Sequence, residues 1–215
     1  MMQSGGADAL KARILAAAAA TPSTTRKRGK QMALLAVALS IGFALMLFEL
    51  AGGLAHSRDR PLGQTVRLAD GWGLVSTVLT WLVLGRGGST LARSPPVLLS
   101  ATAASPIALY AWMQHFPTLG IHQDTEVLCL LLTVAFGSAP LAAFLALRRG
   151  LEPSHPGILG AAAGAMSGAW AAVLVLLWCP QTDALHALVG HVLPNILLIA
   201  LGAKIGSSTL APRPV

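Results

Sequence analysis

The stretch GILGAAAGAMSGAWAAVLVLLW, Gly157 to Trp178, holds 22 residues and no charged side chain. About 20 mostly apolar residues are enough for an α-helix to cross the ~30 Å hydrocarbon core of a bilayer. Gly160, Gly164 and Gly168 recur every four residues, so they lie on one helix face, where a second helix can approach closely. The stretch therefore predicts a membrane-spanning helix that packs tightly against a neighbour.

The composition of the whole chain agrees with a membrane protein. Of its 215 residues, 54% are hydrophobic and 11% are charged, whereas soluble domains carry roughly 25% charged residues. The predicted fold is all-α, a polytopic membrane protein with six transmembrane helices at about 32–55, 68–85, 97–113, 127–147, 157–178 and 184–205. We divide the chain into a cytoplasmic N-terminal tail, a transmembrane domain and a short cytoplasmic C-terminal tail, at residues 1–31, 32–206 and 207–215.

The positive charges predict the topology. Twelve of the 15 Lys and Arg residues fall in the N-terminal tail, in the second and fourth loops and at the C-terminal end; the exceptions are Arg58, Arg60 and Arg67. Because Lys and Arg concentrate on the cytoplasmic side, both termini are expected in the cytoplasm of a bacterial cell, with the chain in its inner membrane. The basic pI of about 10.5 then reflects topology, and no direct contact with nucleic acid is expected.

Reactive side chains gather near the predicted outer face, above all in WCPQTDALHALVGH, residues 178–191. Cys129, Cys179, His186 and His191 could hold zinc or another thiophilic metal ion. The two thiols could instead form a disulfide in an oxidising compartment, or serve only as packing at helix ends. Two cysteines exclude a disulfide scaffold and a four-cysteine metal site, and no other cofactor is implied.

Two further readings concern ionisable groups inside the spans. Glu49 lies in the outer half of the first span, and such intramembrane acids are functional candidates; with His191 it could belong to a small transporter or channel subunit. The segment AMSG, with Ser167, suggests a Ser–His pair with His191, as in an intramembrane protease. Their predicted depths differ by several ångströms, and no metalloprotease or phosphate-loop motif occurs, so no enzyme is expected.

The N-terminal tail contains ADALKARILAAAAA, residues 7–20. Leu10 and Ile14 share one face of the predicted helix, with Lys11 and Arg13 beside them. A helix this short is marginal alone in water but can fold in the groove of a partner. The alternative is a leader whose role is to set topology.

The C-terminal half resembles a known family. LALRRG at 145–150 precedes the Gly/Ala-rich span, and WCPQTDALHALVGHVLP at 178–194 precedes ALGAKIG at 200–206. This pattern is similar to the NrsF-type six-helix membrane anti-sigma factors of proteobacteria, over about 80 residues; the first half matches by helix count. Cys179, Pro180 and Asp183 match the family's Cys-Pro turn, and Cys129 stands where its first cysteine lies.

The resemblance implies a regulator that holds an extracytoplasmic-function sigma factor at the inner membrane until a stress signal arrives. Such signals include oxidants and metals and, in related CarR-like myxobacterial proteins, light. By this resemblance, Cys129 and Cys179 become sensing thiols, and the tail becomes the sigma-binding segment through Leu10, Lys11, Arg13 and Ile14. The implied partners are the sigma factor and the lipid bilayer, with no substrate.

Overall fold

The computed structural model describes residues 12, 16, 26–54, 60–84, 94–116, 126–148 and 154–210. The chain divides into two compact units, Met1–Leu35 and Ala36–Val215, which are described separately. In the first unit, Ala12, Ala16 and residues 26–35 are helical, and Ala12 and Ala16 are exposed. Leu10, Lys11, Arg13 and Ile14, predicted to bind a sigma factor, lie outside the described residues.

The described part of the chain is helical and contains no strand, which confirms the all-α prediction there. Each predicted span coincides with a helix, although α3 begins six residues before the predicted start at residue 68. The elements are α2 Arg26–Leu50, α3 Leu62–Leu84, α4 Pro95–Met113, α5 Glu126–Arg148, α6 Pro156–Trp178, α7 Ala184–His186, the π-helical segment η2 Ala187–Val192 and α8 Leu193–Thr209.

Four stretches among these residues are long and apolar enough to cross a membrane: α4, α5, α6 and the continuous run Ala184–Thr209. Six spans were predicted, so two of them lack this support. In α2 the stretch Ala38–Leu50 is apolar, but it is shorter than a membrane-spanning helix needs to be. In α3 the first half carries Gln64, Arg67 and Asp70, whose polar side chains dilute its apolar character.

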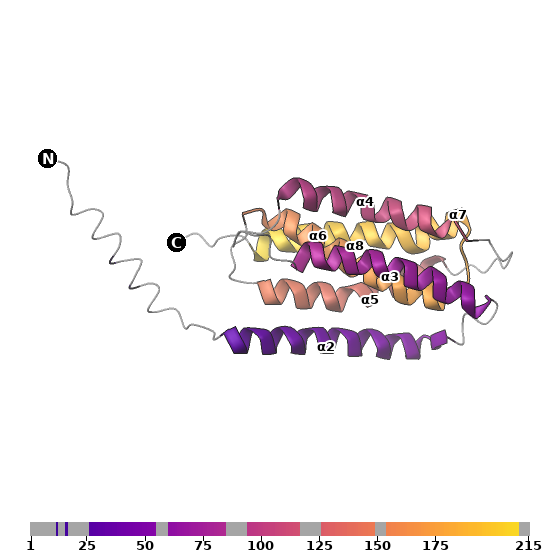
Figure 1. Cartoon of the computed structure of the whole chain (residues 1–215), viewed down its shortest axis with the longest axis horizontal. Coiled ribbons are helices and arrows are strands. Elements are labelled where there is room, and N and C mark those ends of the chain that lie inside the picture. Colours follow the sequence, from indigo (N-terminus) through magenta and orange to yellow (C-terminus); the bar gives the residue numbers. More distant parts are fainter. Residues whose placement is uncertain are drawn as a thin grey trace. The chain divides into compact units, whose positions relative to one another are not determined.

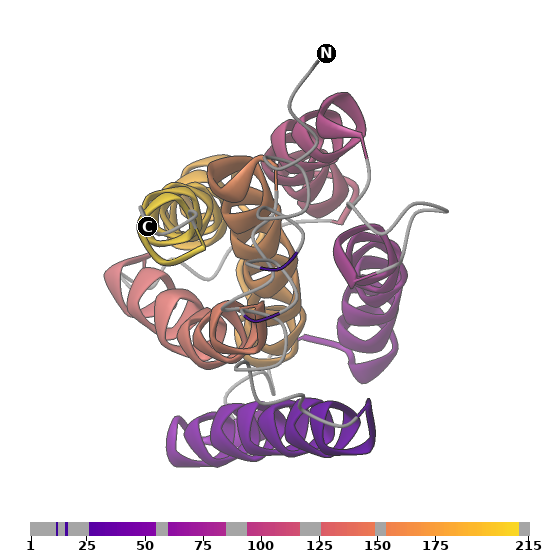
Figure 2. The ribbon, with the colours of Figure 1, turned by 90° about the vertical axis from the view of Figure 1, so that its left-hand side faces the viewer.

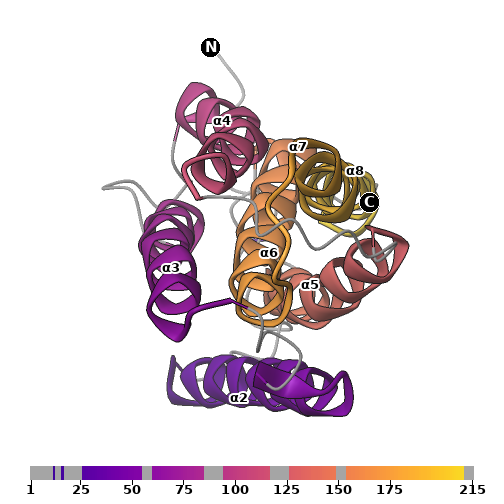
Figure 3. The ribbon, with the colours of Figure 1, turned by 90° about the vertical axis from the view of Figure 1, so that its right-hand side faces the viewer.

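Helix α6 is the centre of the second unit. It makes its most extensive contacts with α8, followed by α3, α5 and α4, and the two end views show these helices arranged around it (Figure 2 and Figure 3). Seen from the side, α3, α4, α5, α6 and α8 run along a common long direction (Figure 1). Because α6 is surrounded, most of its residues are buried, as its uncharged sequence allows.

The contact between α6 and α8 is made backbone against backbone. A Cβ atom at Gly160 would collide with Gly202 O, and one at Gly164 would collide with Leu198 O. In return, a Cβ at Gly202 would collide with Gly160 O, and one at Gly206 would lie 2.7 Å from Pro156 O. The predicted glycine face of α6 is therefore confirmed as a close helix–helix contact, and α8 supplies the partner glycines.

Polar side chains point inward and many large apolar ones point outward. Buried hydroxyls and amides include Thr65, Ser76, Thr102, Ser105, Thr133, Ser167 and Asn195. Exposed apolar side chains occur on several helices and include Leu39, Leu45, Leu74, Val78, Trp81, Ile107, Val127 and Leu131. Small and polar residues between helices, with apolar residues outside, are typical of helices packed within lipid.

We expect Gly160→Ala to destabilise the protein, because the added methyl group must push α8 away from α6. Overpacking of this kind costs about 1–3 kcal/mol. The matched control is Gly73→Ala in α3, where a Cβ meets nothing within 4 Å; alanine there should be neutral or stabilising by up to ~1 kcal/mol. Unfolding of both variants by SDS in detergent micelles, followed by circular dichroism, measures the difference. Equal stabilities would contradict the close-contact interpretation.

Candidate functional site

Cys129, Cys179, His186 and His191 come together in the folded chain. Their ligand atoms all lie within 4.8 Å of one another, and all four residues are buried. Cys129 lies in the first turns of α5, Cys179 follows the end of α6, His186 ends α7 and His191 lies in η2. The sequence predicted this set from topology; whether it binds a metal ion stays a prediction. We call these four residues the Cys/His cluster.

Cys179 lies where α6 ends. Its N–H donates to Val175 O at 2.7 Å, and the following Pro180 has no N–H and cannot continue the helix. Arg60, itself buried, donates through Nη2 to Pro180 O. The turn that follows is buried at Gln181 and Thr182 as well, so it is part of the packed interior of the unit.

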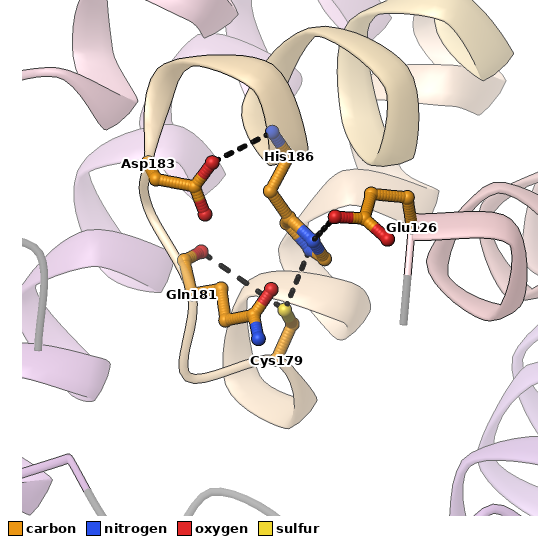
Figure 4. Close-up of polar contacts among 5 residues, drawn as sticks. All are labelled: Glu126, Cys179, Gln181, Asp183 and His186. Carbon is orange, nitrogen blue, oxygen red and sulfur yellow. Dashed lines mark hydrogen bonds and ion pairs between the residues drawn. The ribbon is translucent and has the colours of Figure 1, made fainter. Parts of the chain in front are cut away.

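His186 makes contacts through both its backbone and its ring. Its backbone N–H donates to Asp183 Oδ1 at 3.0 Å, a side-chain cap at the start of α7. Its ring lies between two groups (Figure 4): Nε2 is 3.1 Å from Cys179 Sγ, and Nδ1 is 4.0 Å from Glu126 Oε1. Since Glu126 begins α5, this ring joins the end of α6 to the start of α5.

His191 reaches the cluster because η2 is a π-helix. Five residues separate it from His186, which in an α-helix would place the two side chains about 140° apart around the axis. In a π-helix the i→i+5 hydrogen bond brings such residues onto the same side. The two imidazole rings have centroids 5.3 Å apart. The π-helical turn therefore brings together two histidines that an α-helix would place on different sides of its axis.

A glycine lets α5 and η2 approach at this point. A Cβ at Gly190 would lie 3.1 Å from Cys129 Cβ and 3.3 Å from His186 Nε2. Thr133 Oγ1 donates to Cys129 O at 2.7 Å and lies 3.3 Å from Gly190 O. The small residue and the hydroxyl together hold the two cluster-bearing elements in contact.

The surroundings favour the negatively charged form of Cys179. Interaction with the Cys129 thiol lowers the pKa of Cys179 most, and His186 and His191 lower it further, although burial acts in the opposite direction. The pKa of Arg60 is lowered by burial, and the nearby Cys179 thiolate raises it by a smaller amount. No disulfide joins Cys129 to Cys179 in the structure. The cluster thus has the electrostatics of a thiolate site.

Sequence reasoning missed Arg60, Glu126 and the π-helical turn. Arg60 is one of the three basic residues on the predicted outer side, and nothing in its local sequence predicts that it is buried beside Cys179. Glu126 precedes the predicted start of its span by one residue. The one feature that could have indicated η2 is the five-residue spacing of two histidines shortly before a proline. It is a weak indication, because in an ordinary α-helix residues at this spacing do not lie on the same side.

The other predicted residues lie apart from this arrangement. Glu49 is exposed near the end of α2, and one of its carboxylate oxygens would lie 3.2 Å from a Cβ added at Gly53. This position gives no support to a conduction pathway through Glu49. Ser167 Oγ and both ring nitrogens of His191 make no hydrogen bond of ordinary geometry, so the described residues contain no Ser–His hydrogen bond of the kind a protease would use.

Comparison with known proteins adds a family. The family model described as NrsF, negative regulator of sigma F, matches residues 15–211. A curated relative, the probable anti-sigma-F factor NrsF of Azospira oryzae, is 34% identical over 87 residues, which cover 40% of this chain and 41% of the relative. The match thus spans less than half of that relative's length. No solved structure matches significantly.

The lowered pKa of Cys179 predicts a pH dependence in chelator-treated protein. Its thiolate should persist below the ordinary thiol pKa of about 8.5. A depressed pKa contributes stability that is present above the unfolded-state value and is lost as pH falls through the folded-state value. Cys129→Ala should raise the pKa of Cys179, because it removes the side-chain donor that is the largest cause of the shift. Thiolate ultraviolet absorbance against pH measures this, with Cys179→Ser as the control; an unchanged titration in Cys129→Ala would contradict it.

Proposed function

Since this chain belongs to the NrsF family of negative regulators of sigma F, we propose that it is a membrane-embedded anti-sigma factor. It holds an extracytoplasmic-function sigma factor at the bacterial inner membrane and releases it when an oxidant, metal or light signal arrives. The observation that carries the proposal is the family match over residues 15–211. This range covers every helix from α2 to α8 and part of the N-terminal tail. The role is regulatory, as in the family.

Six membrane-spanning helices fit this function best. Beyond the four helices that qualify by length and composition, α3 exposes Leu74, Val78 and Trp81 while it buries Thr65 and Ser76. That inverted arrangement supports contact with lipid along α3. Helix α2 exposes large apolar side chains through its second half, which supports the same role. With six spans and the observed distribution of Lys and Arg, both termini lie in the cytoplasm.

The N-terminal tail is the sigma-binding segment in this proposal. Ala12 and Ala16 are helical and exposed, in keeping with the helix predicted from Leu10 and Ile14. The cytoplasmic loops of the six-span topology are short. The tail therefore offers the longest cytoplasmic segment with an apolar stripe, and a partner groove can bury that stripe.

The thiols of Cys129 and Cys179 are the sensing groups. They belong to one buried apolar cluster with Phe48, Val175 and Trp178, so a chemical change at either sulfur must disturb the packing of several helices. Trp178, directly before Cys179, donates to Ala51 O at 2.8 Å. Ala51 follows α2, and α2 leads back along the chain to the tail. This contact offers a route from the thiols to the sigma-binding segment.

Reporter fusions test the topology. Alkaline phosphatase fused after residue 60, 120 or 182 should be active, and fusions after residue 90, 152 or 213 should be inactive, because the enzyme folds outside the cytoplasm. The reason is the excess of Lys and Arg in the segments assigned to the cytoplasm. Green fluorescent protein at the same positions serves as the control, since it should report the reverse pattern. Phosphatase activity at the second set would reject the orientation.

The double change Leu10→Asp and Ile14→Asp should release the sigma factor without any signal. Each fully buried aliphatic side chain contributes ~1.5–3 kcal/mol, partly offset by ordering of the tail, so a loss of about 2–5 kcal/mol is expected. This corresponds to at least a thirtyfold weaker complex. Transcription from sigma-dependent promoters, together with recovery of the sigma factor with purified membranes, measures the effect.

The matched control is Ala12→Asp with Ala16→Asp. It adds the same charge to the same predicted helix, at positions the structure shows as exposed and about 200° around the axis from Leu10 and Ile14. This control should still repress. If the Leu10/Ile14 variant inserts normally and represses as well as the unchanged chain, the tail does not bind the sigma factor.

A further inference from the structure

We propose that Cys129, Cys179, His186 and His191 form a tetrahedral binding site for one divalent metal ion of the zinc class. The ligand set is two thiolates and two imidazoles. The binding site is argued from its geometry alone. The further idea that this ion acts at the sensing site rests on the proposed function.

The chemistry of the donors selects the ion. A tetrahedral set of two sulfur and two nitrogen ligands is typical of Zn²⁺, whereas Mg²⁺ and Ca²⁺ prefer oxygen. With Zn–S near 2.3 Å and Zn–N near 2.0 Å, tetrahedral ligand atoms lie about 3.3–3.8 Å apart. The four ligand atoms lie within 4.8 Å of one another, so a contraction of at most about 1–1.5 Å at the widest pair completes the geometry.

His191 gives independent support. Its side chain is 0% exposed, and although the ring interacts electrostatically with Cys179, neither ring nitrogen makes a hydrogen bond of ordinary geometry. A buried polar group left without a partner costs about 1–3 kcal/mol. One nitrogen directed to a metal ion removes part of that cost, and its position within the cluster makes a metal ion the fitting partner.

The charges balance in a buried place. Two thiolates neutralise a divalent cation, so the loaded site carries no net charge into an interior where an unpaired ion would be costly. A singly charged ion would leave the site negative. The remaining charged groups near the cluster are Arg60 beside Cys179 and two carboxylates, Glu126 and Asp183, beside His186.

A carboxylate lies close to the second ring nitrogen of one imidazole. His186 turns Nε2 toward Cys179 Sγ, and its Nδ1, which makes no hydrogen bond, lies 4.0 Å from the Glu126 carboxylate (Figure 4). Metal-binding histidines commonly donate their second N–H to a carboxylate, which fixes the tautomer and ring orientation. A shift of about 1 Å on metal binding would let His186 Nδ1–H donate to Glu126, so Glu126 is the positioning residue of the loaded site and binds no metal itself.

The ion would tie together three parts of the fold. Cys129 comes from α5, Cys179 from the turn after α6, and the two histidines from α7 and η2. A metal ion at this point joins all three, so loss of the ion removes the bonds between α5 and η2 and leaves the packing at Gly190 and the Thr133 hydroxyl to hold them. That consequence gives the sensing thiols a physical means of changing the helix packing.

The test uses the full chain purified from membranes in detergent, incubated with Zn²⁺ or Co²⁺ and freed of unbound ion by gel filtration. We expect about one metal ion per chain by elemental analysis, and a Co²⁺ spectrum with tetrahedral bands and thiolate charge transfer. Cys129→Ser and His191→Ala should lose both. Glu126→Gln keeps the ligands and should lower the Zn²⁺ affinity about 10–100-fold in a chelator competition.

The control is His115→Ala, which removes an exposed histidine at the end of α4 and should bind as the unchanged chain does. Absence of bound metal in the unchanged chain would overturn the proposal. It would also be overturned if the His191→Ala variant bound as much metal as the unchanged chain, or if the Co²⁺ spectrum were six-coordinate. Co-purification of the sigma factor is measured on the same samples. Metal binding without sigma binding would refute the proposed function alone, and the reverse result would refute the metal site alone.

Discussion

The close contact between α6 and α8 is the constraint on which the rest of the second unit depends. Within lipid, helices gain little from the hydrophobic effect when they associate, so van der Waals contact between small residues carries much of the packing. Gly160 and Gly202 bring the two backbones together. With α6 surrounded by other helices, its end and the turn that follows become interior positions, which is why Cys179 is buried although it lies outside a helix.

The Cys/His cluster follows from this arrangement. A turn of five residues separates the end of α6 at Trp178 from the start of α7 at Ala184, so the chain must reverse at once and place His186 beside Cys179. The Asp183 cap fixes the start of the new helix. The π-helical turn then adds His191, and Gly190 lets Cys129 approach from α5. The steps along the turn, α7 and η2 are local, and the approach of α5 adds a donor that is distant in the sequence.

A thiolate site in an apolar interior needs nearby positive charge or a cation. Arg60 supplies a fixed positive charge next to Cys179, and its hydrogen bond to Pro180 O holds it there. A divalent ion within the cluster would supply the rest. A site of this kind responds to both oxidants and thiophilic metals because both act on thiolate sulfur, which suits a regulator whose family is defined by the control of a sigma factor.

The sequence alone determined the helical class, the approximate position of each helix, the glycine face of α6 and the set of four residues in the cluster. These features depend on local composition, on periodicity and on the side of the membrane to which a loop belongs, all of which can be read along the chain. The predicted sigma-binding residues and the six-span topology stay predictions. Only the tertiary structure decided that Arg60 is buried beside Cys179, that Glu126 faces His186, and that a π-helical turn aligns His191. The first two features arise from contacts between distant segments, up to 120 residues apart, and no local pattern in a single sequence encodes such contacts. The π-helical turn is local, but a short apolar run fits an α-helix as well, so the sequence does not mark it.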